Sequence, residues 1–192
     1  MQLHDHETVS STRRTRNGLR WLVTFLGFPL GGLVAELVVG PVDGLIAAFI
    51  GGAITGLILG AVQAWALRPL GIPTPAWIGS TGAGLAVGLT VGAAAVDYGT
   101  SMGDLALQGA ICGVAVGIAQ AIVLRARVGG VAFVWVPVLG ACWVLGWVVT
   151  TAIGVDVESQ YTVFGSSGAL VVTIVTAALP VFLTRRAARS VS

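Results

Sequence analysis

Apolar residues gather into six long runs, separated by short breaks that are polar or rich in glycine. Each run has about twenty residues or more, the length that a helix needs to cross a bilayer. The runs cover residues 19–39, 44–67, 77–96, 105–124, 131–153 and 162–183. Helices are required because hydrocarbon offers no partner to an unpaired backbone group, and the alternating pattern of a membrane barrel is missing from the sequence. The pattern predicts an all-α, polytopic membrane protein with six transmembrane helices.

Two of the runs contain near-copies of one segment. The segments GAITGLILGAVQAWALR at 52–68 and GAICGVAVGIAQAIVLR at 109–125 agree at 9 of 17 positions without a gap, at a separation of 57 residues. A third copy, from Gly165, keeps small residues but loses the row of glycines, and Thr176 takes the place of Gln120. Parallel repeats of one unit predict a pseudo-threefold axis along the membrane normal.

Pairing consecutive helices gives three tandem helical hairpins within a single domain over residues 18–184. The hairpins cover 19–67, 77–124 and 131–183, and their first helices begin at Trp21, Trp77 and Trp135. Residues 1–17 lack an apolar run and are predicted to be a disordered tail, and 185–192 a second tail. In outline this resembles the mitochondrial carriers, but the Pro-x-Asp/Glu-x-x-Lys/Arg motifs of that family do not occur in the sequence, so we assign no family.

Charge alternates in sign from one break to the next. Of the acids that follow Glu7, all but Glu36 lie in the first, third and fifth breaks: Asp43, Asp97, Asp104, Asp156 and Glu158. The arginines lie in the second and fourth breaks and the terminal segments: Arg13, Arg14, Arg16, Arg20, Arg68, Arg125, Arg127, Arg185, Arg186 and Arg189. Six crossings place every arginine on one side. Because arginine-rich loops stay in the cytoplasm, we expect a cell-membrane protein with both termini cytoplasmic.

Tryptophans divide into two groups. Four lie at the predicted cytoplasmic ends of the runs: Trp21, Trp65, Trp77 and Trp135. There an indole can bury its ring in the membrane interface and keep its N–H in water, so we expect interfacial anchors. Trp143 and Trp147, one turn apart in the fifth run, are expected to face lipid or a neighbouring helix.

Composition supports the membrane class and excludes several functions. The chain is 56% hydrophobic and only 9% charged, against about 25% in a soluble domain. Too few polar residues are available to cover a soluble core of this size. The ten positive charges are all arginine, and no basic stripe with interleaved aromatics occurs, so a nucleic acid is not an expected partner.

Glycine recurs at every fourth position in three of the runs. The rows are Gly52, Gly56 and Gly60; Gly84, Gly88 and Gly92; and Gly109, Gly113 and Gly117. Such a row forms a flat stripe along a helix, and membrane helices gain stability by close backbone approach. We therefore expect a glycine zipper, in which these stripes are helix-packing surfaces.

Four polar residues inside the runs form a candidate polar site: Glu36, Gln63, Gln120 and Thr176. Gln63 and Gln120 lie three residues beyond their last glycine, so both are aimed at a neighbouring helix. They either hydrogen-bond across to that helix or, with Thr176, form a polar site at the cytoplasmic end of a central cavity, and Thr81 could join either arrangement.

Glu36 is the one ionisable residue well inside a run, so it is either an interfacial glutamate or an ion site. Pro29, also in the first run, is expected to kink the helix and free the carbonyl of Phe25. Cys112 and Cys142 are expected to be small packing residues, and the His4–His6 segment a solvated tail, so we predict no metal site and no cofactor. Catalytic motifs are missing from the runs, so we do not expect an enzyme.

Two functions are compatible with these features. The first is a compact bundle without catalytic activity that serves as a structural or accessory subunit, with the lipid bilayer, other membrane proteins or further copies of itself as partners. The second is a small channel or permease for an ion or small solute, with a site between the hairpins that uses Glu36, Gln63 and Gln120. The sequence does not specify a substrate.

Overall fold

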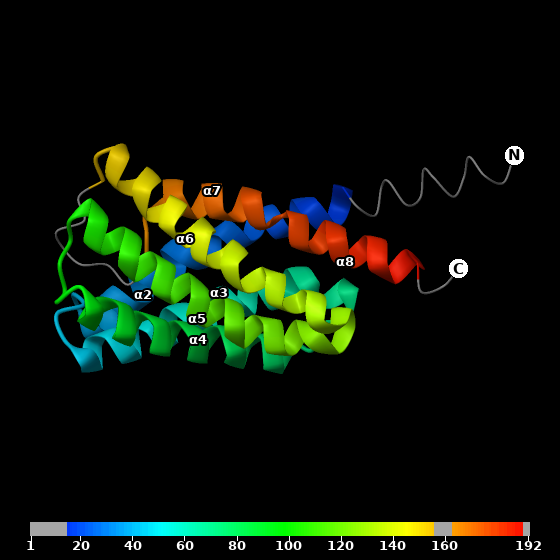
Figure 1. Cartoon of the computed structure of the whole chain (residues 1–192), viewed down its shortest axis with the longest axis horizontal. Helices are drawn as coiled ribbons and strands as arrows, with labels where there is room; N and C mark the ends of the chain where they lie inside the picture. Colours follow the sequence, from blue (N-terminus) through cyan, green and yellow to red (C-terminus); the bar gives the residue numbers. More distant parts are fainter. Residues whose placement is uncertain (1–14, 156–162, 190–192) are drawn as a thin grey trace, which may run out of the picture.

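The structure, a computed structural model, describes residues 15–155 and 163–189 as a bundle of helices (Figure 1). Predictions that concern residues 1–14, residues 156–162 and residues 190–192 lie outside the described chain. Five stretches of helix are long and apolar enough to cross a membrane: Thr15–Val39, Leu45–Leu70, Thr74–Ala95, Met102–Ala152 and Ser166–Arg185. The predicted all-helical, multi-pass class is confirmed at this level.

Short 3₁₀ segments divide these stretches into individual helices. The first comprises helical residues 15–23, η1 (Thr24–Leu26) and α2 (Gly27–Val39). Next come α3 (Leu45–Leu67), η2 (Arg68–Leu70) and α4 (Thr74–Ala95). The fourth stretch contains α5 (Met102–Val128), η3 (Gly129–Val134) and α6 (Trp135–Ala152). The last contains α7 (Ser166–Thr176) and α8 (Ala178–Arg189).

The 51-residue stretch Met102–Ala152 reverses its direction at Gly129. As one straight helix it would be roughly 75 Å long, far more than a bilayer is thick. Gly129 ends α5 with φ +66°, a conformation that favours glycine. Gly109 of α5 lies against Trp147, and Gly117 lies against Val136, so the contacts run in opposite directions along the two helices. Helices α5 and α6 are therefore antiparallel neighbours (Figure 1).

Packing follows the order of the chain and closes on itself. Each of α2 to α6 packs against the next helix, and α7 packs against α6, η1 and α2. The first and last helices are therefore neighbours. The largest fully buried side chains include Trp21, Trp77, Trp143 and Phe164. These aromatic rings occupy the interior of the bundle.

The three glycine rows lie where consecutive helices approach most closely. A Cβ on Gly56 of α3 would lie 2.7 Å from the carbonyl oxygen of Thr81 in α4. A Cβ on Gly88 of α4 would lie 2.8 Å from the Cα of Cys112 in α5, and all nine glycines meet the following helix in this way. At six of the nine the Cβ would lie 2.5–2.8 Å from backbone atoms, which real Cβ atoms essentially never do. At Gly60, Gly92 and Gly109 it would lie 3.0–3.1 Å from the nearest backbone atom, so a larger residue at most of these positions would push the helices apart.

Three prolines account for the breaks in helical geometry. Proline cannot donate to the carbonyl four residues earlier, and its ring crowds that carbonyl. The carbonyl four residues before Pro29 belongs to Phe25 in η1. The carbonyl before Pro137 belongs to Phe133 in η3, and the one before Pro180 belongs to Thr176, the last residue of α7. Where the kink at Pro29 was expected, the α-helix gives way to the 3₁₀ segment η1.

The loops and helix ends at the two ends of the bundle (Figure 1) carry charges of opposite sign. We call one the acidic end, which carries Asp43, Asp97 and Asp104, and the other the arginine end, which carries Arg20, Arg68, Arg125, Arg127 and Arg185. The first and last described segments meet at the arginine end, where Asn17 donates to the hydroxyl of Thr184 at 3.1 Å. Asn17 is buried there, although it falls within the segment predicted as a tail.

Candidate polar site at the arginine end

Gln120 of α5 is the centre of a buried hydrogen-bond network. Its side-chain oxygen accepts from the indole of Trp135 at 2.8 Å. Its amide nitrogen donates to the hydroxyl of Thr81 at 2.9 Å and to the side-chain oxygen of Gln63 at 3.2 Å. The oxygen of Gln63 also accepts from the indole of Trp77 at 3.1 Å. One amide therefore connects α3, α4 and α6 to α5.

The hydrogen bonds of Gln120 within the network are all made to other side chains of the protein. A glutamine side chain can make four hydrogen bonds, two through its amide hydrogens and two through its oxygen. Gln120 makes three of them, with both hydrogens and the oxygen each bonded to a neighbouring helix. Gln120 is only 1% exposed. A buried polar group costs little when it is bonded and much when it is not, so the network favours this one arrangement of helices.

Thr176 lies in a second, smaller unit. Its hydroxyl accepts from the indole of Trp21 at 3.1 Å and donates back to the carbonyl of Val172 at 2.7 Å. The hydroxyl of Thr24, one turn beyond Trp21, donates to the carbonyl of that tryptophan at 2.6 Å. Helix α7 is thereby joined to the first helical segment.

The tryptophans correct one expectation from the sequence. Trp21, Trp77 and Trp135 are buried hydrogen-bond donors, at 1%, 0% and 8% exposure, and not interfacial anchors. Trp65 alone of the four is exposed, and the guanidinium of Arg20 lies 4.5 Å from its ring centroid. These three indoles are buried in the bundle and not at the membrane interface, because a polar side chain on the adjacent helix accepts from the indole N–H and replaces water. In the sequence, Trp77 follows Gln63 by 14 residues and Trp135 follows Gln120 by 15, and this shared spacing could have predicted the two hydrogen bonds.

Glu36 does not belong to this network. It lies one turn before the end of α2, next to the acidic end, and it is half-buried. Gln63 is near the opposite end of α3, and the 18 residues from Leu45 to Gln63 rise roughly 27 Å. The structure therefore divides the four residues of the candidate polar site between the two ends of the bundle.

A cluster of aromatic rings, which we call the aromatic middle, packs between α2, α6 and the segment before α7. Phe28 of α2, Trp143 and Trp147 of α6, and Phe164 before α7 form edge-to-face and tilted pairs with centroids 5.0 to 6.0 Å apart. The prediction that the two tryptophans face lipid or a neighbouring helix is resolved in favour of the helix. Gly146 makes room for this cluster, because a Cβ there would lie 3.0 Å from the ring of Phe164.

Cys112 and Cys142 are buried free thiols on the adjacent helices α5 and α6. Among the described residues, histidine, cysteine, aspartate and glutamate do not gather in groups of three or more that could hold a metal ion. The two cysteines occupy interior space like other small apolar residues.

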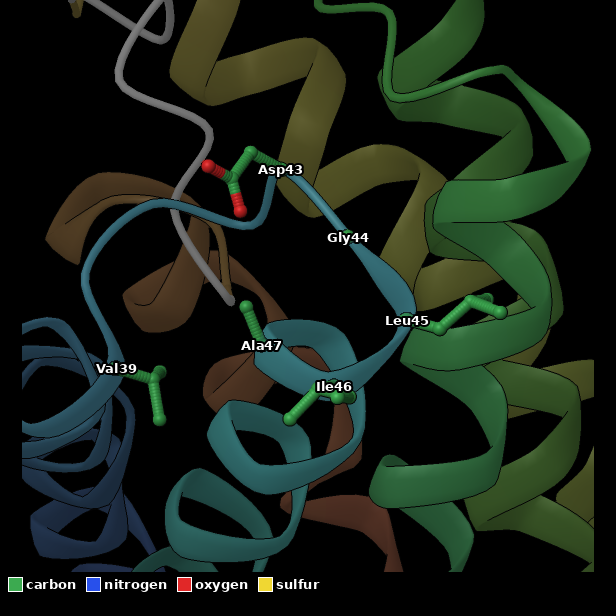
Figure 2. Close-up of a pocket in the computed structure, with 6 residues that line it drawn as sticks. All are labelled: Val39, Asp43, Gly44, Leu45, Ile46 and Ala47. Carbon is green, nitrogen blue, oxygen red and sulfur yellow. The ribbon is translucent and has the colours of Figure 1, made fainter.

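A depression of about 600 Å³ lies at the acidic end (Figure 2). Among the described residues it is lined by Val39, Asp43, Gly44, Leu45, Ile46 and Ala47, of which Asp43 alone is charged. The depression lies at the loop between α2 and α3, roughly the length of α3 away from Gln63. It is separate from the buried network.

The network offers hydrogen bonds and no reactive chemistry. Amides, a hydroxyl and indoles do not change charge near neutral pH, so they cannot act as an acid and base pair.

Comparisons with protein-family models, with curated proteins and with solved structures find no match for this chain.

Proposed function

We propose that the chain crosses the membrane six times as three tandem hairpins with a pseudo-threefold axis. Three tryptophan hydrogen bonds support this. Each joins the second helix of one hairpin to the first helix of the next: Gln63 to Trp77, Gln120 to Trp135, and Thr176 to Trp21. The third bond closes the cycle, and the antiparallel α5 and α6 supply the extra crossing within Met102–Ala152.

The proposed orientation puts the arginine end in the cytoplasm. The arginines of the described chain lie at that end, and positively charged segments near membrane helices are retained on the cytoplasmic side. Both terminal segments lie there too, which requires an even number of crossings.

For the function itself we infer a bundle without catalytic activity that acts as a structural or accessory subunit of a membrane complex. The observation that carries this inference is the use of Gln120: all three of its hydrogen-bonding groups are occupied by neighbouring helices. A transport site needs polar groups that exchange partners with a solute, whereas these groups fix helices to one another. The glycine contacts and the aromatic middle have the same effect.

The test is isolation of the tagged chain from native membranes in a mild detergent, followed by mass spectrometry of what is retained. We expect a membrane protein at a fixed stoichiometry, retained equally by the Gln120→Leu variant if that variant folds. A chain that migrates as a lone monomer in native membranes would remove the proposal.

The competing function is a small channel or permease. Reconstituted proteoliposomes distinguish it: we expect no flux of ions or small solutes above that of empty liposomes. Flux that is lost on Glu36→Gln or on Gln120→Leu would establish the permease instead. Because Glu36 and Gln120 lie at opposite ends of the bundle, loss in one variant alone would also locate the site.

A further inference from the structure

An apolar groove of about 200 Å³ opens at the arginine end, between α8 and the turn from α5 to α6. Its lining includes Leu124 and Val128 of α5, Val131 and Val134 of η3, and Leu179 and Phe182 of α8. The indole of Trp135 also lines it, but its N–H is already donated to Gln120. The groove therefore presents hydrocarbon.

The groove exists because two prolines interrupt the helices that border it. Pro137 accompanies the 3₁₀ geometry of η3, and Pro180 accompanies the end of α7 and the start of α8. Small residues, Ala132 and Ala178, line the space between these elements. Val131 and Val134 are 47% and 60% exposed, so the groove opens toward the outside of the bundle and not toward the buried network.

Arginines of α5 and α8 lie within one turn of residues that line the groove, and we consider one from each helix, since the guanidinium of Arg127 already donates to the carbonyl of Gly71. Arg125 is three residues before Val128 on α5, and Arg185 is three residues after Phe182 on α8, so each shares a helix face with a lining residue. Both side chains are exposed. The acidic side chains of the described chain lie at the other end of the bundle or, for Glu36, next to it, so they are out of reach of these guanidinium groups.

We propose that this groove binds an anionic phospholipid, with one acyl chain against the apolar lining and the phosphate between Arg125 and Arg185. Hydrocarbon alone would accept the tail of any lipid. Guanidinium groups add selectivity because they bind phosphate by two parallel hydrogen bonds and attract a net negative headgroup. This site is independent of the proposed scaffold function, because it concerns a lipid and not a protein partner.

Native mass spectrometry of the purified chain tests the site. The probes are phosphatidylglycerol and phosphatidylcholine with identical acyl chains. We expect phosphatidylglycerol to bind about 25-fold more tightly, since each of the two arginines near the headgroup contributes about a factor of five. The double variant Arg125→Gln, Arg185→Gln should bind both lipids equally, whereas Arg20→Gln, at the same end and with its guanidinium over the ring of Trp65, should keep most of the preference.

A second variant tests the acyl chain separately. Ala178→Phe fills the groove and should weaken both lipids several-fold, while Ala83→Phe, an exposed alanine on α4, should bind as the wild type does. Equal binding of the two lipids by the wild-type chain, or a wild-type preference in the double arginine variant, would overturn the proposal. Should Ala178→Phe fail to fold, Val134→Phe at the exposed rim replaces it with the same expectation.

Discussion

At the scale of single residues, the polar side chains of the buried network are explained by their partners, whereas the hydroxyl of Thr150 is buried without a hydrogen bond. Gln120 and Gln63 satisfy two indole N–H groups that would otherwise be buried without an acceptor. At the acidic end, Ser101 and Asp104 form a capping box that begins α5, in which the hydroxyl of Ser101 accepts from the backbone of Asp104. The network and capping residues are thus placed where backbone or indole groups need them.

Replacing Gln120 by leucine should destabilise the bundle by about 1–3 kcal/mol, because the indole of Trp135 loses its acceptor inside a low-dielectric interior. The measurement is the free energy of unfolding in mixed detergent micelles. Gln108→Leu is the matched control, since Gln108 is a buried glutamine on the same helix outside the network. Equal losses in the two variants would contradict the role assigned to Gln120.

At the scale of helices, the glycines determine how closely neighbouring helices approach, and the prolines determine where a helix is interrupted. Along α4, Gly88 meets the backbone of Cys112, whereas Gly79 has no atom within 4 Å of its would-be Cβ. The same residue type on the same helix therefore has two roles, one at an interface and one at the surface. Only the interface glycines, such as Gly88, belong to the row with a glycine at every fourth position.

The α4 glycines give a matched pair for mutation. Gly88→Ala should cost about 1–3 kcal/mol, because α4 and α5 must separate to admit the methyl group. Gly79→Ala should leave stability unchanged or raise it by roughly 0.5–1 kcal/mol, as alanine loses less backbone freedom in a helix. Thermal unfolding in detergent is the measurement, and a Gly79→Ala loss as large as that of Gly88→Ala would refute the assignment.

At the scale of the whole molecule, the closed order of packing and the separation of charge define an up-and-down bundle. The arginine end holds the first and last described segments, the turns between α3 and α4 and between α5 and α6, and the tryptophan hydrogen bonds. The acidic end holds the remaining turns of the described chain. The two ends therefore differ in both charge and internal bonding.

Cysteine labelling tests this arrangement in a background with Cys112→Ala and Cys142→Ala. Met102 and Gly130 lie just at the beginning and just beyond the end of α5, and both are exposed. With an impermeant maleimide, Met102→Cys should react from outside the cell and Gly130→Cys only after the membrane is opened. Reaction of both from one side would refute the proposed topology.

Sequence alone determined the helical membrane class and the approximate positions of the breaks between helices, whereas several helix ends differ from the predicted runs by three to six residues. Both depend on local quantities: the length of each apolar run, and the inability of proline to donate a hydrogen bond. The glycine rows could also be read as packing faces, because their spacing matches the helical period. The charge sorting came from the same local pattern of breaks.

Tertiary structure alone decided which helix each polar group meets. Whether an indole is buried depends on whether a hydrogen-bond acceptor lies across the helix interface. Trp65 therefore stays exposed, while Trp21, Trp77 and Trp135 are buried. The positions of Glu36 and Gln63 near opposite ends of their helices follow from the sequence, but only the packing shows that Gln63 bonds to Trp77 while Glu36 lies outside the network. Depth along a helix follows from the sequence, but a hydrogen-bond partner follows only from the packing of residues far apart in the chain.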